Sequence, residues 1–201
     1  MPTKRLISGI VNRTPWTLDP LIHQNMSCSM IKGTLGPLPI DATFPATIHI
    51  IVGVKTFNVQ QSDLSLYTEF SVSVKADNPN HLIGFIYGKE SSVAVLYTGK
   101  TLCSGKLPAF HQPGNNITVM NILMKGKNEF GSGLQESLLQ NQKKGKIPLL
   151  IMVKAPVSVV IAGFPLRQVV VFVNCSLVVD NLSPNHKIGI LSSKYTYDIG
   201  L

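Results

Sequence analysis

Apolar and polar residues alternate along most of the chain after residue 46. In residues 69–76 every second side chain is apolar, and those between them are polar or charged. The apolar members are Phe70, Val72, Val74 and Ala76. Because successive side chains of a β-strand point to opposite faces, this period of two predicts a strand with one buried face. The stretch ends at Asn78-Pro79-Asn80, where proline removes a ladder donor and asparagine favours a turn.

The same criteria predict a series of further strands separated by turn residues. They span 83–87, 92–98, 100–106, 116–126, 147–161, 166–180 and 186–198. Short strands with frequent turns are typical of a β-sandwich or barrel. Residues 1–40 show no sustained period, and we expect residues 1–43 to form an irregular arm with Trp16 partly buried. Residues 44–201 are then one domain.

One segment of the chain has a helical period. Its apolar stripe consists of Phe130, Leu134 and Leu138. Ser132 followed by Gln135 resembles a capping box, and Gly145 supplies a left-handed stop. We expect one short helix that covers an open end of the β core.

Composition and charge narrow the class of protein. Of 201 residues, 44% are hydrophobic and 14% charged, which excludes a disordered chain and suffices for one core without disulfide or metal. The net charge of +8 favours acidic partners such as phospholipid headgroups, nucleic acid or acidic polysaccharide. Lys143, Lys144 and Lys146 form the densest basic group, read either as a solvated helix end or as a contact for an acidic surface. No basic stretch is interleaved with aromatic residues, which argues against nucleic acid.

Neither a leader nor a membrane helix is expected from the pattern. Residues 6–22 are interrupted by Asn12, Arg13, Pro15 and Asp19, so no apolar region of a signal peptide is evident. The longest apolar span, residues 46–54, has about half the roughly 20 residues that a membrane helix requires.

Signatures of catalysis are absent from the sequence. The five histidines are isolated, and no zinc spacing, nucleophile elbow or complete phosphate-binding loop occurs. We therefore expect no enzyme activity, no catalytic residue, no metal and no cofactor. Three cysteines, Cys28, Cys103 and Cys175, permit at most one internal disulfide, and their spacing leaves the redox compartment open.

Acceptor motifs for N-glycosylation are more frequent than catalytic ones. The triplet Asn-X-Ser/Thr begins at Asn12, Asn25, Asn116, Asn174 and Asn181. Pro15 and Pro184 follow two of them and weaken modification there, which leaves Asn116, Asn174 and Asn25 as candidates. Asn174 alternates with Val173 and Cys175, so it points away from the core if those two residues point inward. The alternative is that these triplets are accidental.

Several segments, in their order, resemble one plant family. They include Phe57-Asn58-Val59, Val72 to Asn80, Ile83 to Tyr87, Val95 to Gly99, Leu107 to Gln112, Asn116 to Thr118, Gly145 to Leu149 and Val173 to Cys175. The residues that carry the motifs are Asn78, Pro79, Asn80, Gly84, Tyr97, Pro108, Phe110 and Gln112. Over residues 44–199, the chain is similar to the harpin-induced and non-race-specific disease resistance-like proteins, which carry a late embryogenesis abundant type 2 domain.

That resemblance implies a fold and a place of action. The expected fold is an all-β, seven- to eight-stranded antiparallel sandwich of the fibronectin III or immunoglobulin kind, with the short helix at one end. Relatives resemble plasma-membrane proteins whose sandwich lies outside the cell, although residues 1–40 lack the family's membrane helix. A truncated gene model and a soluble member are both open. The family often has a cysteine where Tyr195 stands, so Cys175 is expected to be reduced or inert.

The leading functional hypothesis is a non-enzymatic interaction domain of plant defence and stress responses. We expect protein partners at the plasma membrane or cell wall, with contact to acidic lipid or pectin through the three lysines. The alternatives are a soluble dehydration-stress protein of the same fold and a lipid-binding module. The sequence leaves the specific partner and the oligomeric state open.

Overall fold

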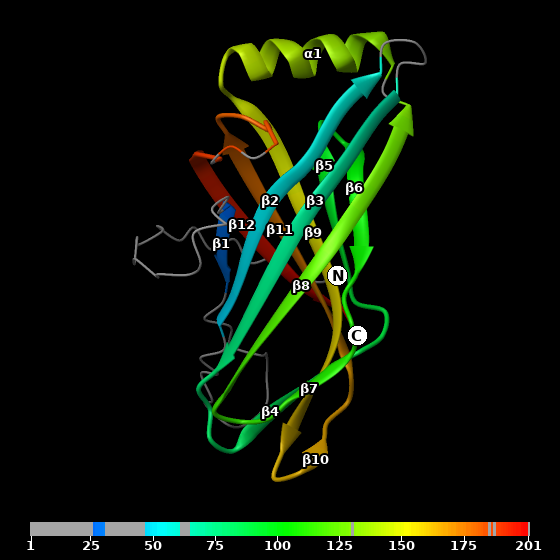
Figure 1. Ribbon diagram of the computed structural model, residues 1–201. Helices are drawn as coiled ribbons and strands as arrows, with labels where there is room; N and C mark the ends of the chain where they lie inside the picture. The colour runs from blue at the N-terminus through cyan, green and yellow to red at the C-terminus, as the bar shows by residue number, and fades with distance from the viewer. Residues whose placement is uncertain are drawn as a thin grey trace.

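The computed structural model describes residues 26–30, 47–60, 65–129, 131–184, 186 and 188–200. Within them it contains strands and one helix (Figure 1). The strands are β1 (Met26–Met30), β2 (Thr47–Gln60), β3 (Ser65–Asn78), β4 (Ile83–Tyr87), β5 (Ser92–Tyr97), β6 (Lys100–Lys106), β7 (Phe110–Gln112), β8 (Asn116–Glu129), β9 (Ile147–Ile161), β10 (Phe164–Pro165), β11 (Val169–Val179) and β12 (Ile190–Gly200). The helix, α1, spans Ser132–Lys143.

All of these strands join one antiparallel sheet. Its main path runs β1-β2-β3-β8-β6-β5-β9-β11-β12. Strand β9 is the centre of the second half of this path. One edge of β9 pairs with β11 and β10, and the other edge pairs with β5 and β4. Strand β4 also pairs with β7, and this small extension lies at the end of the molecule opposite α1 (Figure 1).

The two halves of the sheet meet at one narrow seam. Strands β6 and β8 are joined through the register pair of Ser104 with Lys125. Next to it, the Leu102 carbonyl accepts hydrogen bonds from Thr68 Oγ1 at 2.6 Å and from Asn128 Nδ2 at 3.0 Å. A Cβ atom at Gly126 would overlap that carbonyl oxygen. Strand β6 can approach β8 this closely only because residue 126 is glycine.

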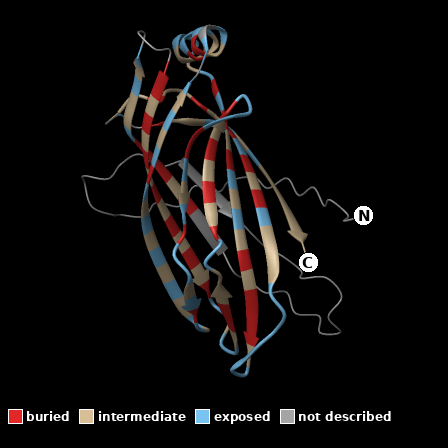
Figure 2. Ribbon diagram, turned by 90° about the vertical axis from the view of Figure 1, so that its right-hand side faces the viewer, coloured by how far each residue is buried: buried red, intermediate tan, exposed pale blue. Residues whose placement is uncertain are grey.

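The core lies inside the curl of the sheet. It is filled by inward side chains of β2 and β3, such as Val52 and Phe70, and by those of β5, β9 and β11, such as Val95, Ile151 and Leu177. Buried positions therefore alternate with less buried ones along the strands (Figure 2). Each fully buried aliphatic or aromatic side chain contributes roughly 1.5–3 kcal/mol to folding, so this alternation drives the curl.

Irregular positions help the sheet to bend. The register between β2 and β3 shifts after Val54, so that Lys55 has no cross-strand partner residue in this pairing. Similar shifts follow Val95 in β5 and Val178 in β11. A bulge of this kind bends a strand and increases its twist, which lets a long sheet close around one core.

The structure confirms an all-β antiparallel fold with one short helix. The sequence pattern gave the bounds of β4, β6 and β9 correctly. The sandwich type is not confirmed, since the described strands form a single sheet curled into a half-barrel. The narrow seam between β6 and β8 explains the difference. Each half of the sheet has the buried and exposed alternation expected of a separate sheet, but the register pair between β6 and β8 joins the two halves into one.

The helix is present, but its start differs from the capping box that the sequence suggested. Gly131 is the N-cap, with φ of 61°, and it has no side chain to cap with. Its carbonyl instead accepts the Gln135 amide at 3.2 Å, while Ser132 is the first helical residue. The end is as predicted, with Gly145 in the left-handed region at φ of 61°. Leu134 and Leu138 face the core, whereas Phe130 lies outside the described residues.

Three strands were not foreseen. Residues Met26–Met30, inside the predicted arm, form β1 and pair with β2. The rest of residues 1–43, including Trp16 and Asn25, lies outside the described residues. Strands β7 and β10 have three and two residues, which is too short for an alternating pattern to reveal.

Candidate interaction surfaces

Most residues of the family motif gather at the loop end of the sheet, opposite α1. Asn78 is fully buried there. Its Nδ2 donates to the carbonyls of Ile83 at 2.8 Å and Pro113 at 3.1 Å. Its Oδ1 accepts from the backbone and side-chain nitrogens of Asn80 at 3.2 and 2.8 Å. One side chain thus joins the β3–β4 loop to the β7–β8 loop.

Gln112 performs a similar role at the neighbouring strand ends. Its Nε2 donates to the carbonyls of Ala76 at 2.9 Å and Asn116 at 3.0 Å, so it connects β7 with β3 and β8. Its Oε1 accepts the Tyr87 hydroxyl at 3.4 Å. The Tyr87 ring stacks on Phe110, with ring centroids 4.3 Å apart. Burial raises the pKa of Tyr87 to about 12, so this hydroxyl remains a donor at physiological pH.

Glycine and proline complete this group. A Cβ atom at Gly84 would lie 3.1 Å from the Gln112 carbonyl oxygen, a closer approach than most side chains tolerate. Pro79 and Pro108 are exposed at the surface. The motif residues at this end therefore fix the loops.

Tyr97 acts at the other end of the molecule, beneath α1. Its ring is fully buried in the core. Its hydroxyl lies 3.1 Å from Ser137 Oγ and accepts a hydrogen bond from Asn141 Nδ2 at 2.8 Å. Leu138, between these two helical residues, is fully buried too. Tyr97 therefore attaches the helix to strand β5.

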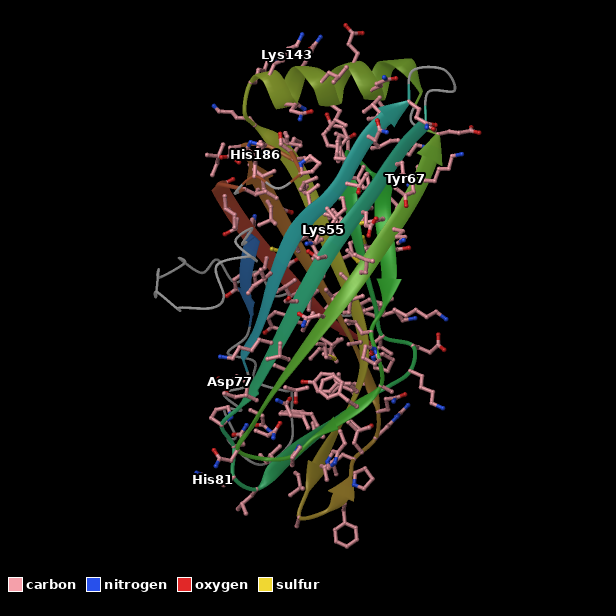
Figure 3. All side chains as sticks on the ribbon, in the orientation of Figure 1. Lys55, Tyr67, Asp77, His81, Lys143 and His186 are labelled. Carbon is pink, nitrogen blue, oxygen red and sulfur yellow. The ribbon has the colours of Figure 1, made fainter. Side chains whose placement is uncertain are left out.

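The three lysines proposed as an acidic-surface contact lie at the C-terminal end of α1. Lys143, Lys144 and Lys146 are all exposed (Lys143 is labelled in Figure 3). The amides of Lys144 and Lys146 donate to Gln140 and Asn141 carbonyls at 3.0 Å each, so the backbone that carries them is fixed. We call these three residues the lysine cluster. Its charges project into solvent from a rigid turn.

The glycosylation candidates lie on β-strands. Asn116 begins β8, and its Oδ1 accepts the hydroxyl of Thr118, the third residue of its acceptor triplet, at 3.1 Å. Asn174 lies in β11 between Val173 and Cys175, which are both buried. Its side chain is partly exposed, as the alternation predicted. Asn25 lies outside the described residues.

The cysteines correct one prediction. Cys175 was expected to be reduced or inert, but it is disulfide-bonded. Tyr195, the position where the resemblance implied a cysteine in related proteins, is the cross-strand neighbour of Cys175. Cys28, the remaining cysteine besides Cys103, lies in β1, the strand that the sequence pattern did not predict.

Cys103 is a free cysteine and is buried. Burial raises the pKa of its thiol and a hydrogen bond with the Val95 backbone lowers it, with a net pKa of about 12. The thiol is therefore protonated at physiological pH and is a poor nucleophile.

Among the described residues, titratable groups do not gather into a reactive centre. No set of three or more His, Cys, Asp or Glu side chains there could hold a metal ion. Buried side-chain polar atoms in this part of the chain all have hydrogen-bond partners. Likewise, no helix in it is long and apolar enough to cross a membrane.

One feature of the loop end was not anticipated. Leu82 and Phe164 are the most exposed large hydrophobic side chains among the described residues, at 81% and 75%. The sequence signal for this hairpin was Gly163 between two apolar runs, because glycine favours a tight turn there. In the structure both Ala162 and Gly163 adopt positive φ in that turn.

Comparison with known proteins identifies a relative. The chain is 39% identical over 140 residues to "NDR1/HIN1-like protein 6" of Arabidopsis thaliana, which covers 69% of this chain and 56% of that protein. The chain thus spans about half the length of the curated relative it matches. No family model matches. A solved structure, "Crystal structure of protein from Archaeoglobus fulgidus", is 14% identical with a TM-score of 0.36, covering 64% of this chain and 94% of that chain.

Proposed function

We propose a function from one premise, that the chain is a homologue of the NDR1/HIN1-like proteins. It is a non-enzymatic interaction domain that acts in plant defence or stress responses at the plasma membrane, on the extracellular side. The relationship to NDR1/HIN1-like protein 6 is the observation that carries this proposal. The roles of the motif residues support a non-enzymatic domain. The polar groups of Asn78, Gln112 and Tyr97 form hydrogen bonds that hold the loops and helix α1 in place.

The lysine cluster is the surface through which the domain contacts an acidic partner. Its three charges lie within four residues of one another and are all exposed. The Asp180 backbone lies beside this turn, with its carbonyl oxygen 3.6 Å from the position of a Cβ atom at Gly145, and its Oδ1 accepts hydrogen bonds from the Gly189 amide and from Asn181 Nδ2, both at 2.7 Å. The ligand we propose is an acidic cell-wall polymer such as pectin, because repeated carboxylates match closely spaced ammonium groups. Acidic lipid is the second candidate.

A salt titration tests this contact. Binding to polygalacturonate should weaken steeply between low and high salt, since exposed charges are screened. Replacing Lys143, Lys144 and Lys146 with Gln should weaken binding roughly a hundredfold at low salt, at about 1 kcal/mol per lysine near an anionic surface. The matched control replaces Lys100, Lys106 and Lys125, which are exposed on β6 and β8. Equal losses in both variants would show that net charge alone binds the polymer.

The compartment is tested separately. In plant-expressed protein, removal of N-glycans should increase gel mobility, and Asn116→Gln or Asn174→Gln should each remove part of that shift. Cell fractionation should place the protein with the plasma membrane. A protein that carries no glycan and fractionates with the cytosol would overturn the proposal in favour of a soluble stress protein.

A further inference from the structure

We infer that the loop end opposite α1 inserts into the surface of a phospholipid bilayer. The inference deepens the proposed function, because it names which end of the domain faces the membrane. We call Leu82, Phe164 and Leu166 the apolar tip. Leu82 and Phe164 are 81% and 75% exposed, and Leu166 is 39% exposed.

The strand pairing brings the apolar tip together. Ile83, which follows Leu82, pairs with Ile161 of β9, and Ile161 pairs with Phe164 of β10. Neighbouring strands lie about 5 Å apart, so the backbones that carry Leu82 and Phe164 are separated by on the order of 10 Å. Strands β4 and β10 form the end of the molecule farthest from α1 (Figure 1).

The loop that carries Leu82 is held rigidly. The Asn78 side chain binds the Ile83 carbonyl, one residue after Leu82. The Asn115 amide donates to the Asn80 carbonyl at 2.7 Å. A Cβ atom at Gly114 would overlap that same carbonyl, so the two loops pack backbone against backbone. Leu82 is thus held out in solvent by the hydrogen-bond network of the motif residues.

The hairpin that carries Phe164 is also fixed. Ala162 and Gly163 adopt φ of 49° and 86°, the combination of a tight two-residue turn between paired strands. The Leu166 amide donates to the Val159 carbonyl at 2.7 Å. A positive φ at Ala162 is unfavourable by itself. It allows a turn of only two residues, which places Phe164 directly after the turn. Both apolar side chains therefore project from preorganised loops.

The chemistry of this end matches a bilayer surface. The loops 79–82, 113–115 and 162–168 contain no Asp or Glu, while Arg167 and His81 are exposed (His81 is labelled in Figure 3). Large apolar side chains beside a guanidinium suit the boundary between lipid chains and phosphate headgroups. A stable protein partner needs about 800 Å² of contact on each side, whereas this end offers a few side chains on separate loops.

In this orientation the apolar tip faces the membrane and the lysine cluster lies at the other end of the domain. Strand β9 runs from Ile147, just after the lysine cluster, to Ile161, beside the apolar tip. Its 15 residues span about 50 Å. A domain that inserts the tip therefore points the lysine cluster away from the bilayer, where an acidic polymer could reach it.

Vesicle sedimentation tests the inference with matched variants. The domain should bind vesicles of phosphatidylcholine with phosphatidylserine, and part of the binding should persist at high salt. Leu82→Ser and Phe164→Ser should each weaken that salt-resistant binding about tenfold, because each removes one inserted side chain. Leu191→Ser is the control, since Leu191 is 55% exposed near the opposite end of the sheet. An equal loss with Leu191→Ser, or no loss with the tip variants, would overturn the inference.

A fluorescent probe tests the depth of insertion directly. Phe164→Cys can be labelled with an environment-sensitive dye, while the buried thiol of Cys103 remains unlabelled. Adding vesicles should shift the emission of the dye to the blue, and a dye placed at Leu191→Cys should not respond. An unshifted dye at residue 164 on bound vesicles would overturn the inference, as would self-association through the tip without lipid.

The outcomes separate this inference from the proposed function. Loss of polygalacturonate binding with the lysine variant, together with tip-independent vesicle binding, would leave the proposed function standing and overturn the insertion. If the protein inserts into vesicles but fractionates with the cytosol and carries no glycan, the insertion stands and the proposed function is overturned.

Discussion

At the scale of single residues, the Asn78 side chain makes more of the hydrogen bonds that join the loops than any other residue of the motif. Its buried amide satisfies two carbonyls and binds Asn80 as well. We predict that Asn78→Ala lowers the free energy of unfolding by about 3 kcal/mol, since buried carbonyls lose their donors. Urea unfolding measures this. The control is Asn121→Ala, whose hydrogen bond with Ser73 Oγ is exposed and should be worth below about 0.5 kcal/mol. Equal losses would refute a special role for Asn78.

Cys103 gives the protein a predicted alkaline instability. Its thiol has a pKa of about 12 in the folded protein, above its ordinary value of 9.0. A raised pKa in the folded state means that stability is complete below pH 9 and is lost as pH rises toward 12. Between pH 8 and pH 10, the loss should be about 1.4 kcal/mol.

Urea unfolding of Cys103→Ala at the same pH values measures that contribution. The variant should start slightly less stable, because a small buried group is lost, and should then lack the decline between pH 8 and pH 10. A decline of the same size in the variant would assign it to other groups. Tyr87, whose pKa is raised to about 12 by burial, should add its own decline only above pH 10.

Residue types alone could not have assigned these roles. The order of the motif residues, with Gln112 after Phe110 and Asn78 before Pro79, was sufficient to indicate the family. That Asn78 and Gln112 meet around the same loops depends on register over more than thirty residues of sequence separation. Alternation gives the face of a residue but not its neighbours across the sheet.

At the scale of elements, the seam between β6 and β8 is the point where the sheet turns. We predict that Gly126→Ala lowers the free energy of unfolding by about 3 kcal/mol or more, because its Cβ atom would overlap the Leu102 carbonyl. The shift would also break the hydrogen bonds from Thr68 and Asn128.

Thermal unfolding with a matched glycine compares the two sites. Gly133→Ala lies in α1, where an added Cβ atom would meet open space. It should be neutral or stabilising by up to about 1 kcal/mol, since alanine favours a helix. If Gly126→Ala folds with the stability of the wild type, the seam is less tightly packed than described.

A clear period or flanking turn residues made most elements predictable. Strands β5 and β9 alternate and helix α1 carries an apolar stripe, whereas β4 and β6 have no regular period and were recognised from the turn residues that flank them. Strand β10 has two residues and is recognisable only through its pairing with Ile161 and Val160 of β9. The number of sheets could not be predicted either, because an alternating strand reads the same in a sandwich and in one curled sheet.

At the scale of the whole molecule, the disulfide at Cys175 connects stability to compartment. Cys175 lies in β11, one of the strands that line the core, and is buried. Disulfides persist in oxidising compartments such as the cell exterior. The sequence could not assign this bond, since three cysteines allow several pairings and β1 was read as part of an irregular arm.

We predict that this disulfide contributes about 2–5 kcal/mol to stability, the range that native disulfides contribute in small secreted domains. Cys175→Ala should unfold at a lower temperature than the wild type, and a reducing agent should lower the wild type to a similar value. Cys103→Ala is the control, since it removes the free cysteine and should keep the full response to reduction. A wild-type midpoint that is the same with and without reductant would mean that the bond adds nothing to stability, and the case for an oxidising compartment would then depend on glycosylation alone.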